Sequence, residues 1–422
     1  MATIPEALAI AIQHHRAGRL QTAEQIYRQV LAVESNHAGA HHLLGVIAAQ
    51  TGKLDEAVVC WRRSIDLNPD FADVHNNLGN ALRDRGKRDE AVACYRRALE
   101  LEPGFAEAHN NLGVAFKEQG KLEEAVTCYR RALELKPNFA GAHSNLLLAL
   151  QYFAGVTPAA LAEAHAEYDR RHAAPLRGAV AQHENVRGCP GRLRLGFVFR
   201  DLRRHPVGYF LVRVLENLDK QQVETVCYSD RIGKDDLRRR LHAAAGQWRD
   251  VIGMSDQRLA EQIRADRIDI LFDMAGHTAR NRLLVFARRP APVQITWAGY
   301  VGTTGLKAMD YLLADRYEVP PGAERHYQER VLRMPEGYVC YDPPGYAPPV
   351  GPLPARECGQ VTFGCFNNPA KVTPHVIEVW ARILRRVPGA RLVLKSHGWN
   401  EGSVGRRFTE MFVARWHPGP NW

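Results

Sequence analysis

Four glycines recur at intervals of 34 residues in the first third of the chain. They are Gly18, Gly52, Gly86 and Gly120, and the residues around them recur in phase. A period of this length indicates stacked helix–turn–helix units, because one such unit cannot bury its apolar face alone and needs neighbours. We therefore expect an α-solenoid over residues 1–150.

Aligned residues of successive units form packing columns, in which large side chains fill the space between helices. The columns consist of Leu44, Leu78, Leu112 and Leu146, then of Tyr27, Trp61, Tyr95 and Tyr129, with Pro69, Pro103 and Pro137 ending the units. The agreement of several columns over three or four copies resembles tetratricopeptide repeats. The resemblance implies that this arm binds proteins or peptides.

One column is polar. Asn77, Asn111 and Asn145 recur on the first helix of their units, although asparagine is neither a good helix former nor a core residue. Such a ladder would hydrogen-bond the backbone of an extended peptide without selecting its side chains. A solvated polar face explains the same column equally well.

Length and charge indicate how many domains the chain has and which ligands suit the residues after the repeats. A chain of 422 residues exceeds what one hydrophobic core serves, so we expect at least two domains. Residues 1–150 hold 17 Lys/Arg and 18 Asp/Glu, and the remainder holds 39 and 28. This basic excess suits nucleic acid, a diphosphate ligand or simple solubility. Nucleic acid ranks last, because no basic tract is interleaved with aromatic residues.

The cysteines and the apolar runs indicate which metal, disulfide and membrane features to expect. The eight cysteines form no C-x-x-C pair, so neither a zinc site nor a disulfide framework is expected, and we predict no metal. The first residues contain no cleavable apolar core, and no later stretch is long enough to cross a bilayer. We expect no membrane association and a cytoplasmic location.

From residue 192 the pattern changes to short apolar runs that alternate with amphipathic stretches. RLRLGFVF and VETVCYS are typical of buried strands, and a helix is expected near Tyr209–Leu218 between them. This alternation predicts a doubly wound parallel sheet over residues 192–342. Residues 151–191 are expected to form a connecting helix and a linker.

Ligands of such sheets bind beyond the carboxyl ends of the strands, so the loops there are where the site should lie. Three loops carry candidate residues, namely Asp201 with His205, then His277, then Gly302 with Thr303. A histidine in a loop is more often structural than catalytic, but its position after a strand favours a functional role.

A segment rich in proline and glycine, residues 343–360, marks a boundary before a second α/β part over residues 361–422. VTFGCFN predicts a strand, HVIEVWARILRRV a helix and ARLVLKS a second strand. Lys371 lies in the first loop, just before Pro374 at the expected helix start. A lysine beside a helix N-terminus can hold a diphosphate, although a solvated lysine is the plainer interpretation.

These motifs together resemble one family. RLRLGFVFRDLRRHP, RPAPVQITWAGYVGTTG, MDYLLAD, the Tyr327-Gln328-Glu329 triplet ahead of RMP, and FGCFNNPAKVTP are similar to the O-linked N-acetylglucosamine transferase and SPINDLY group in bacterial form. The resemblance implies a GT-B catalytic part with two facing Rossmann-like halves. It also implies metal-independent, inverting transfer of a sugar from a nucleotide diphosphate to Ser or Thr hydroxyls of proteins, with no further cofactor.

The resemblance assigns catalytic roles to three residues. His205 matches a histidine near the acceptor hydroxyl, and Asp201 matches an aspartate that passes the proton on. Lys371 matches the lysine that neutralises the departing diphosphate.

Substrate contacts are implied for four more residues. Asn368 matches an amide that contacts the nucleotide, and Gly302 with Thr303 lies in a loop that shapes the acceptor and sugar pocket. His277 is a looser match to a substrate-binding residue.

Several alternatives stay open at this level. UDP-N-acetylglucosamine is the expected donor, with GDP-fucose as the second choice. More strands than follow ARLVLKSHGWN would be needed for a complete second half, so we expect this half to be incomplete. An inert tetratricopeptide scaffold is therefore the alternative to a transferase. The residues do not decide whether the arms pair into a homodimer.

Overall fold

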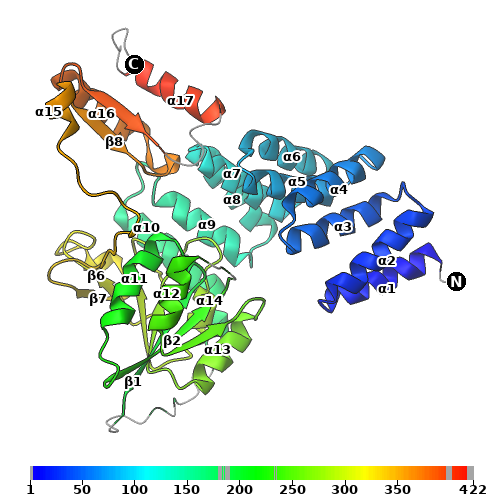
Figure 1. The fold of residues 1–422 in the computed structure, drawn as a ribbon, viewed down its shortest axis with the longest axis horizontal. Helices are drawn as coiled ribbons and strands as arrows, with labels where there is room; N and C mark the ends of the chain where they lie inside the picture. Colours follow the sequence, from blue (N-terminus) through cyan, green and yellow to red (C-terminus); the bar gives the residue numbers. More distant parts are fainter. Residues whose placement is uncertain are drawn as a thin grey trace. The chain divides into compact units, whose positions relative to one another are not determined.

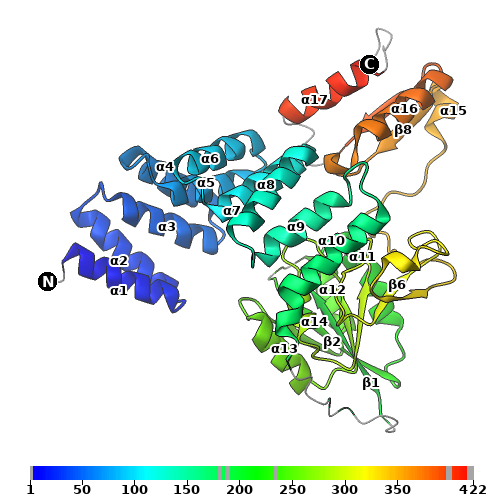
Figure 2. The same ribbon diagram turned by 180° about the vertical axis from the view of Figure 1, so that it is seen from behind.

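The computed structural model describes residues 3–178, 183, 185, 191–231, 233, 235–395 and 402–415. Contacts divide the chain into two compact units, which are described separately below (Figures 1 and 2). Unit 1 consists of Met1–Lys136 and Pro352–Trp422, and unit 2 of Pro137–Gly351. The domain boundaries given above stay predictions. None of the helices in the described ranges is long and apolar enough to cross a membrane.

The first part of unit 1 is a series of antiparallel helical hairpins (Figure 1). Its helices are α1 (Ile4–Arg16), α2 (Leu20–Val33), α3 (Ala38–Gln50), α4 (Leu54–Leu67), α5 (Ala72–Asp84), α6 (Arg88–Leu101), α7 (Ala106–Glu118) and α8 (Leu122–Leu135). The four periodic glycines follow the first helix of each hairpin with φ between +74° and +81°, a conformation that glycine adopts at no steric cost. The predicted α-solenoid is confirmed.

Packing columns hold each hairpin together. Tyr95 is fully buried, and its ring lies against the backbone of Gly79 on the facing helix. A Cβ atom at Gly79 would stand 2.6 Å from the Tyr95 ring, so only glycine allows this approach. Gly113 and Tyr129 repeat the arrangement at 2.7 Å. The sequence columns are therefore contacts between helices.

The second part of unit 1 is a small α/β segment. Its elements are α15 (Pro354–Cys358), β8 (Thr362–Cys365), a 3-10 turn (Pro369–Lys371), α16 (Pro374–Arg386), β9 (Arg391–Leu394) and α17 (Gly402–Val413). β8 and β9 pair in parallel, with Phe363 opposite Leu392. Ile377 of α16 and Phe408 of α17 are buried in the core of this segment.

Unit 2 is built on a parallel sheet with the strand order β3-β2-β1-β4-β5-β6-β7. The strands are β1 (Leu193–Phe199), β2 (Val223–Ser229), β3 (Gln247–Asp250), β4 (Ile270–Asp273), β5 (Val293–Trp297), β6 (Tyr311–Ala314) and β7 (Arg330–Arg333). The order 3-2-1-4-5-6 is that of the doubly wound dinucleotide-binding fold. The predicted doubly wound sheet is confirmed.

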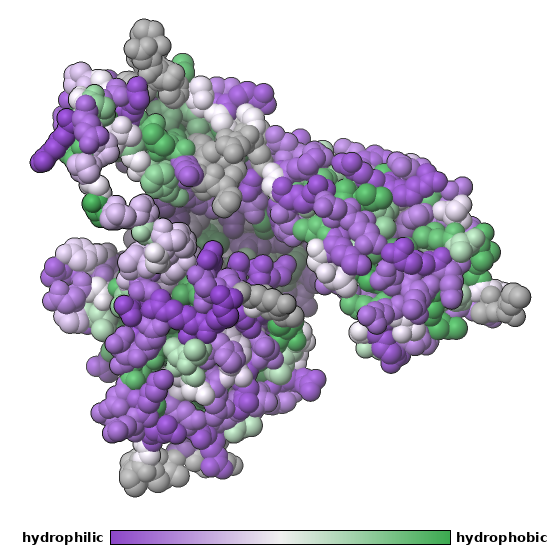
Figure 3. Space-filling view, in the orientation of Figure 1, coloured by the Kyte–Doolittle hydropathy of each residue, from purple (hydrophilic) through white to green (hydrophobic). Residues whose placement is uncertain are grey.

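Helices cover both faces of this sheet. α11 (Pro206–Asn217) and α12 (Asp236–Ala244) pack on one face, where Leu211 and Leu241 meet Phe197. α13 (Asp256–Ala265) and α14 (Leu283–Ala287) pack on the other, in one apolar cluster with Val198 and Leu271. The outward surface of unit 2 that Figure 3 shows is mainly hydrophilic, as expected for amphipathic helices over a buried sheet.

The chain between the hairpins and the sheet also belongs to this core. It forms α9 (Ala140–Leu150) and α10 (Pro158–Tyr168), then a π-helical turn (Asp169–Ala173) and a 3-10 turn (Ala174–Leu176). Leu147 and Tyr168 from these helices lie in the same apolar cluster as Val198 of β1. The segment expected to connect two domains is thus packed against the sheet.

Buried hydrogen bonds fasten α9 to the loops that follow β4 and β5. The hydroxyl of Ser144 lies 3.1 Å from Nδ1 of His277, and Nε2 of His277 lies 2.8 Å from the carbonyl oxygen of Thr304. A carbonyl only accepts, so Nε2 carries the proton and Nδ1 accepts from Ser144. His277 is fully buried and uses both ring nitrogens.

A parallel connection starts from α10. Nδ1 of His165 donates to the carbonyl of Leu161 at 2.7 Å, so Nε2 accepts from the hydroxyl of Tyr300 at 2.8 Å. We call Ser144, His165, His277, Tyr300 and Thr304 the polar seam. Burial lowers the pKa of His165 to about 4 and places that of His277 well below its usual value, so both rings are neutral at pH 7.

The protonation of His165 gives a test of the polar seam. The folded state holds this ring neutral down to about pH 4, whereas the unfolded chain protonates it near pH ~6.5. The unfolded state binds the extra proton in this window, so stability falls as the pH falls, by up to about 1.4 kcal/mol per pH unit. We expect a His165→Gln variant to lose less stability than the wild type between pH 7 and pH 5, measured by urea unfolding.

Only the difference between His165→Gln and the wild type reports on His165, because buried carboxyl groups change the stability with pH in the opposite direction. The pKa of Asp273 is raised to about 6 by burial, so its contribution to stability grows as the pH falls through this value. His242→Gln, which removes an exposed histidine of α12, controls for the substitution itself. Equal losses in the wild type and in His165→Gln would contradict the buried, neutral state of His165.

Candidate active site

The candidate residues of unit 2 follow the carboxyl ends of parallel strands. Asp201 and His205 follow β1, His277 follows β4, and Gly302 and Thr303 follow β5. Because β1, β4 and β5 are neighbours that run in the same direction, these loops lie at one edge of the sheet. Ligands of open parallel sheets bind at this edge.

His205 is the N-cap residue of α11, and Pro206 occupies the first helical position. Nδ1 of the ring accepts a hydrogen bond from the backbone N–H of Val207 at 3.3 Å, and the ring packs edge-on against Phe199. Burial lowers the pKa of His205, and the negative charge of Asp201 offsets part of this effect. The neutral ring with Nδ1 as acceptor carries its proton on Nε2.

Asp201 is held by arginines. Its carboxylate lies 2.8 Å from Nε of Arg203 and 3.6 Å from a terminal nitrogen of Arg231. The pKa of Arg200 is lowered by burial and then by the positive charges of Arg280 and Arg231. Loops after β1, β2 and β4 thus bring several cations to the edge that carries His205, which favours an anionic ligand there.

Thr303 and Thr304 anchor the loop after β5 to a buried carboxylate. The Thr303 hydroxyl donates to one oxygen of Glu329 at 2.6 Å, and the backbone N–H of Thr304 donates to the other at 2.7 Å. Burial raises the pKa of Glu329, and these hydrogen bonds offset part of the rise. In this structure the Thr303 side chain positions the loop rather than facing solvent.

Gly302 has φ +124°, a value that side chains other than glycine rarely permit. A Cβ atom there would stand 2.5 Å from the side-chain nitrogen of Gln151. The predicted substrate role of Gly302 and Thr303 therefore depends on the backbone course of this loop. His277 has no exposed surface and belongs to the polar seam, so we propose that it supports these loops rather than contacting the substrate.

Asp273 ends β4 and shapes the turn that follows. Its carboxylate accepts from the hydroxyl of Thr296 at 2.8 Å and from the backbone N–H groups of Gly276 at 2.9 Å and Ala275 at 3.1 Å. The carboxyl group is fully buried, and burial raises its pKa to about 6. Sequence reasoning missed this residue, although an aspartate at the end of an apolar run was a visible signal.

Glu318, which follows β6 at the same edge, was also missed. Its two carboxylate oxygens are buried and have no hydrogen-bond partner among the described residues. Burial, and then the negative charge of Asp315, raises the pKa of Glu318 to about 8. This side chain is therefore a neutral acid at pH 7. No periodicity in the sequence distinguishes it from a surface glutamate.

The candidate donor-site residues of unit 1 lie in the loop between β8 and α16. The side chain of Asn368 accepts from the backbone N–H of Ala370 at 2.9 Å and caps the 3-10 turn that ends at Lys371. Thr373 caps α16, with Pro374 in its first turn. Lys371 is exposed just ahead of this helix N-terminus, where the helix dipole and the ammonium both favour an anion.

The asparagine column is partly engaged within the repeats. Asn77 in α5 and Asn111 in α7 are half-buried, as is Asn145 in α9. The side-chain nitrogen of Asn111 donates to the side-chain oxygen Oδ1 of Asn76 on the preceding unit at 3.0 Å. This hydrogen bond joins α7 to α5, and the three side chains stay partly exposed.

Comparisons with known proteins agree with this architecture. Residues 142–344 match the model of glycosyl transferase family 41, and residues 47–82, 79–120 and 106–139 match models of tetratricopeptide repeats. Among the similar proteins is one of Solanum lycopersicum with the name "Probable UDP-N-acetylglucosamine--peptide N-acetylglucosaminyltransferase SPINDLY". It is 40% identical to this chain over 266 residues, which are 62% of this chain and 28% of that protein. The SEC protein of Arabidopsis thaliana is 32% identical over 48% of this chain and 22% of its own length.

A solved structure extends the match over both units. A mutant of the Thermobaculum terrenum O-GlcNAc transferase superimposes with a TM-score of 0.83 and 37% identity, covering 90% of this chain and 72% of the other. The chain spans less than a third of the curated plant relatives and most of this bacterial transferase. The predicted fold class, repeats followed by an α/β part of the GT-B type, is confirmed. This chain belongs to glycosyltransferase family 41, the O-GlcNAc transferase and SPINDLY group.

Proposed function

We propose that the protein transfers N-acetylglucosamine from UDP-N-acetylglucosamine to Ser or Thr hydroxyls of proteins. The observation that carries this proposal is that the candidate residues of the α/β parts all follow carboxyl ends of parallel strands. The family model matches the part of the chain that holds most of them, residues 142–344. Membership of the family supports the reaction class. The donor, the inverting course and the acceptors are proposed.

Lys371 is proposed to hold the diphosphate of the donor. Charge builds on the leaving diphosphate as the bond to the sugar breaks, and a fixed cation stabilises this charge more than it stabilises the bound substrate. Its position ahead of the N-terminus of α16 supports the role, because the backbone N–H groups of that first turn add to the field. Asn368 would fix the nucleotide from the same loop.

His205 is proposed to orient the acceptor hydroxyl as a hydrogen-bond donor. Its Nδ1 is engaged by the N–H of Val207, so in the neutral ring the free Nε2 donates rather than accepts. Asp201 would stabilise positive charge on this ring if a proton reaches it late in the transfer. The loop with Gly302 and Thr303 would border the sugar and the acceptor.

Acceptor proteins are proposed to bind along the repeats. Asn77, Asn111 and Asn145 repeat at the spacing of the hairpins, and amide side chains can hydrogen-bond the backbone of an extended chain without reading its sequence. A ligand held in this way would be recognised by its backbone. This mode suits an enzyme that modifies many proteins.

Lys371→Ala gives the test of the donor site. We expect this variant to lose transfer about 10²- to 10³-fold, the loss typical of removing one group that stabilises a developing negative charge. The measurement is incorporation of radiolabelled sugar from UDP-N-acetylglucosamine into protein. Arg382→Ala, which removes an exposed cation from the helix α16 that follows Lys371, should keep full activity.

Three results would oppose this proposal. Unchanged transfer by Lys371→Ala would remove the lysine from the donor site. No transfer by the wild type from UDP-N-acetylglucosamine, with transfer from GDP-fucose, would reassign the donor, and no transfer from either would favour an inert scaffold.

Substitutions at His205 separate an orienting role from a general base. Asparagine can cap α11 and still present an N–H donor, but it cannot take up a proton. We expect His205→Asn to retain activity at least tenfold above His205→Ala, measured as kcat at saturating donor. If His205→Asn is as inactive as His205→Ala while both variants bind the donor normally, the ring acts as the base.

A further inference from the structure

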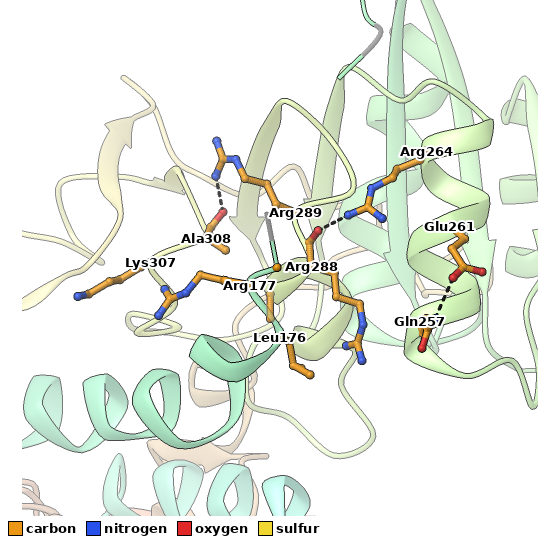
Figure 4. Close-up of a pocket in the computed structure, with 11 residues that line it drawn as sticks. Leu176, Arg177, Gln257, Glu261, Arg264, Arg288, Arg289, Lys307 and Ala308 are labelled. Carbon is orange, nitrogen blue, oxygen red and sulfur yellow. Dashed lines mark hydrogen bonds between the residues drawn. The ribbon is translucent and has the colours of Figure 1, made fainter. Parts of the chain in front are cut away.

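Unit 2 contains a cavity of about 500 Å³ that is lined by basic side chains. Figure 4 shows Arg177 after the 3-10 turn, Arg264 of α13, Arg288 and Arg289 after α14, and Lys307 ahead of β6 around this space. Glu261 is the carboxylate that lines it. We call this space the basic cavity.

The basic cavity lies at the end of the sheet opposite to the candidate active site. Arg264 stands near the end of α13, which leads into β4, while Arg288 and Arg289 lead into β5, and Lys307 leads into β6. These positions precede strands that are parallel, whereas His205 and Thr303 follow strands. The basic cavity is therefore at the amino edge and is separate from the proposed donor and acceptor contacts.

Two of the cations are already paired. Arg177 forms an ion pair of 2.9 Å with Asp169, and Arg289 forms one of 2.8 Å with Asp310. Arg289 also donates to the backbone carbonyls of Ala308 and Pro292. These two side chains build the walls of the basic cavity and hold them in place.

Three cations at the basic cavity have no carboxylate partner among the described residues. Arg264 donates to the backbone carbonyl of Arg288, and Arg288 donates to that of Leu284 at 2.7 Å. The ammonium of Lys307, an exposed residue, has no hydrogen bond to another residue that the structure describes. Glu261 balances only one of these charges, and it accepts from Gln257 at 3.1 Å.

The excess of positive charge at the basic cavity also affects the pKa of a nearby histidine. The pKa of His183 is lowered by burial and then by the charges of Arg289 and Arg264. A guanidinium near a helix C-terminus is common, because it satisfies the last carbonyls, and this accounts for single bonds of Arg264 and Arg288. It does not account for Lys307 beside them or for an open space of this size.

We propose that the basic cavity binds a small ligand carrying a diphosphate or two phosphate groups. Its volume falls in the range of small-molecule sites, about 300–1,000 Å³. Guanidinium groups bind phosphate oxygens through paired hydrogen bonds, and the ammonium of Lys307 adds a mobile point charge. An anion with two or more charges would neutralise the cations that no carboxylate of the described residues pairs with.

Inorganic pyrophosphate is the probe, and its binding to the full chain is measured by isothermal titration calorimetry at about 150 mM salt, where weak surface attraction is screened. Because Lys371 is itself proposed to hold a diphosphate, every titration uses the Lys371→Ala background. We expect one saturable site. Lys307→Gln should raise the dissociation constant for pyrophosphate about tenfold. The double variant Arg264→Gln with Arg288→Gln should raise this constant further.

Arg258→Gln, on the exposed side of α13, is the matched control and should leave the dissociation constant unchanged. Lys307→Gln keeps the test valid even if the double variant fails to fold, because this side chain has no described hydrogen bond to lose. The proposal is overturned if the Lys371→Ala chain shows no saturable binding. It is equally overturned if Lys307→Gln and the double variant both bind as tightly as their parent.

Discussion

The hydrogen bond between Ser144 and His277, continued from His277 to the carbonyl of Thr304, is the constraint on which unit 2 depends. It joins α9 to the loops after β4 and β5, which are far from α9 in the sequence. In an apolar interior, a polar group without its partner costs about 1–3 kcal/mol, so this connection fixes one arrangement of the loops. The last repeat-like helix and the sheet therefore form one body.

The same loops carry both buried anchors and residues of the proposed site. Glu329 holds Thr303 and Thr304 from inside, and Asp273 holds the turn ahead of His277. The loop backbone is then rigid where Gly302 turns. A transfer reaction gains rate mainly from groups held in place before the substrate binds, so buried anchors beneath these loops would support the proposed transfer without touching the substrate. At the other edge of the sheet, the walls of the basic cavity are likewise held by buried or half-buried partners, the ion pairs of Arg177 and Arg289.

Local patterns made part of this architecture predictable. The 34-residue period predicted the hairpins, because the contacts of a hairpin lie between neighbours in sequence. Apolar runs predicted β1, β2, β8 and β9. The helix α11 begins at Pro206, ahead of the predicted Tyr209, because His205 caps it. The sequence does not separate β5 from the loop that follows it. Ser144 and His277 are 133 residues apart, so no local pattern could show their contact, nor the convergence of cations from separate segments on one cavity.

Hydrogen exchange of the loop amides shows whether the Ser144–His277 hydrogen bond holds the loops after β4 and β5. Ser144→Ala removes one hydroxyl from the polar seam with little change in volume, and it leaves Nδ1 of His277 without its donor. We expect amides of residues 276–281 and 299–306 to exchange at least about fivefold faster in the variant, because local opening becomes easier by about 1 kcal/mol or more. The amides of β1 and β2 should keep their protection. Unchanged exchange in both loops would contradict this role of the hydrogen bond.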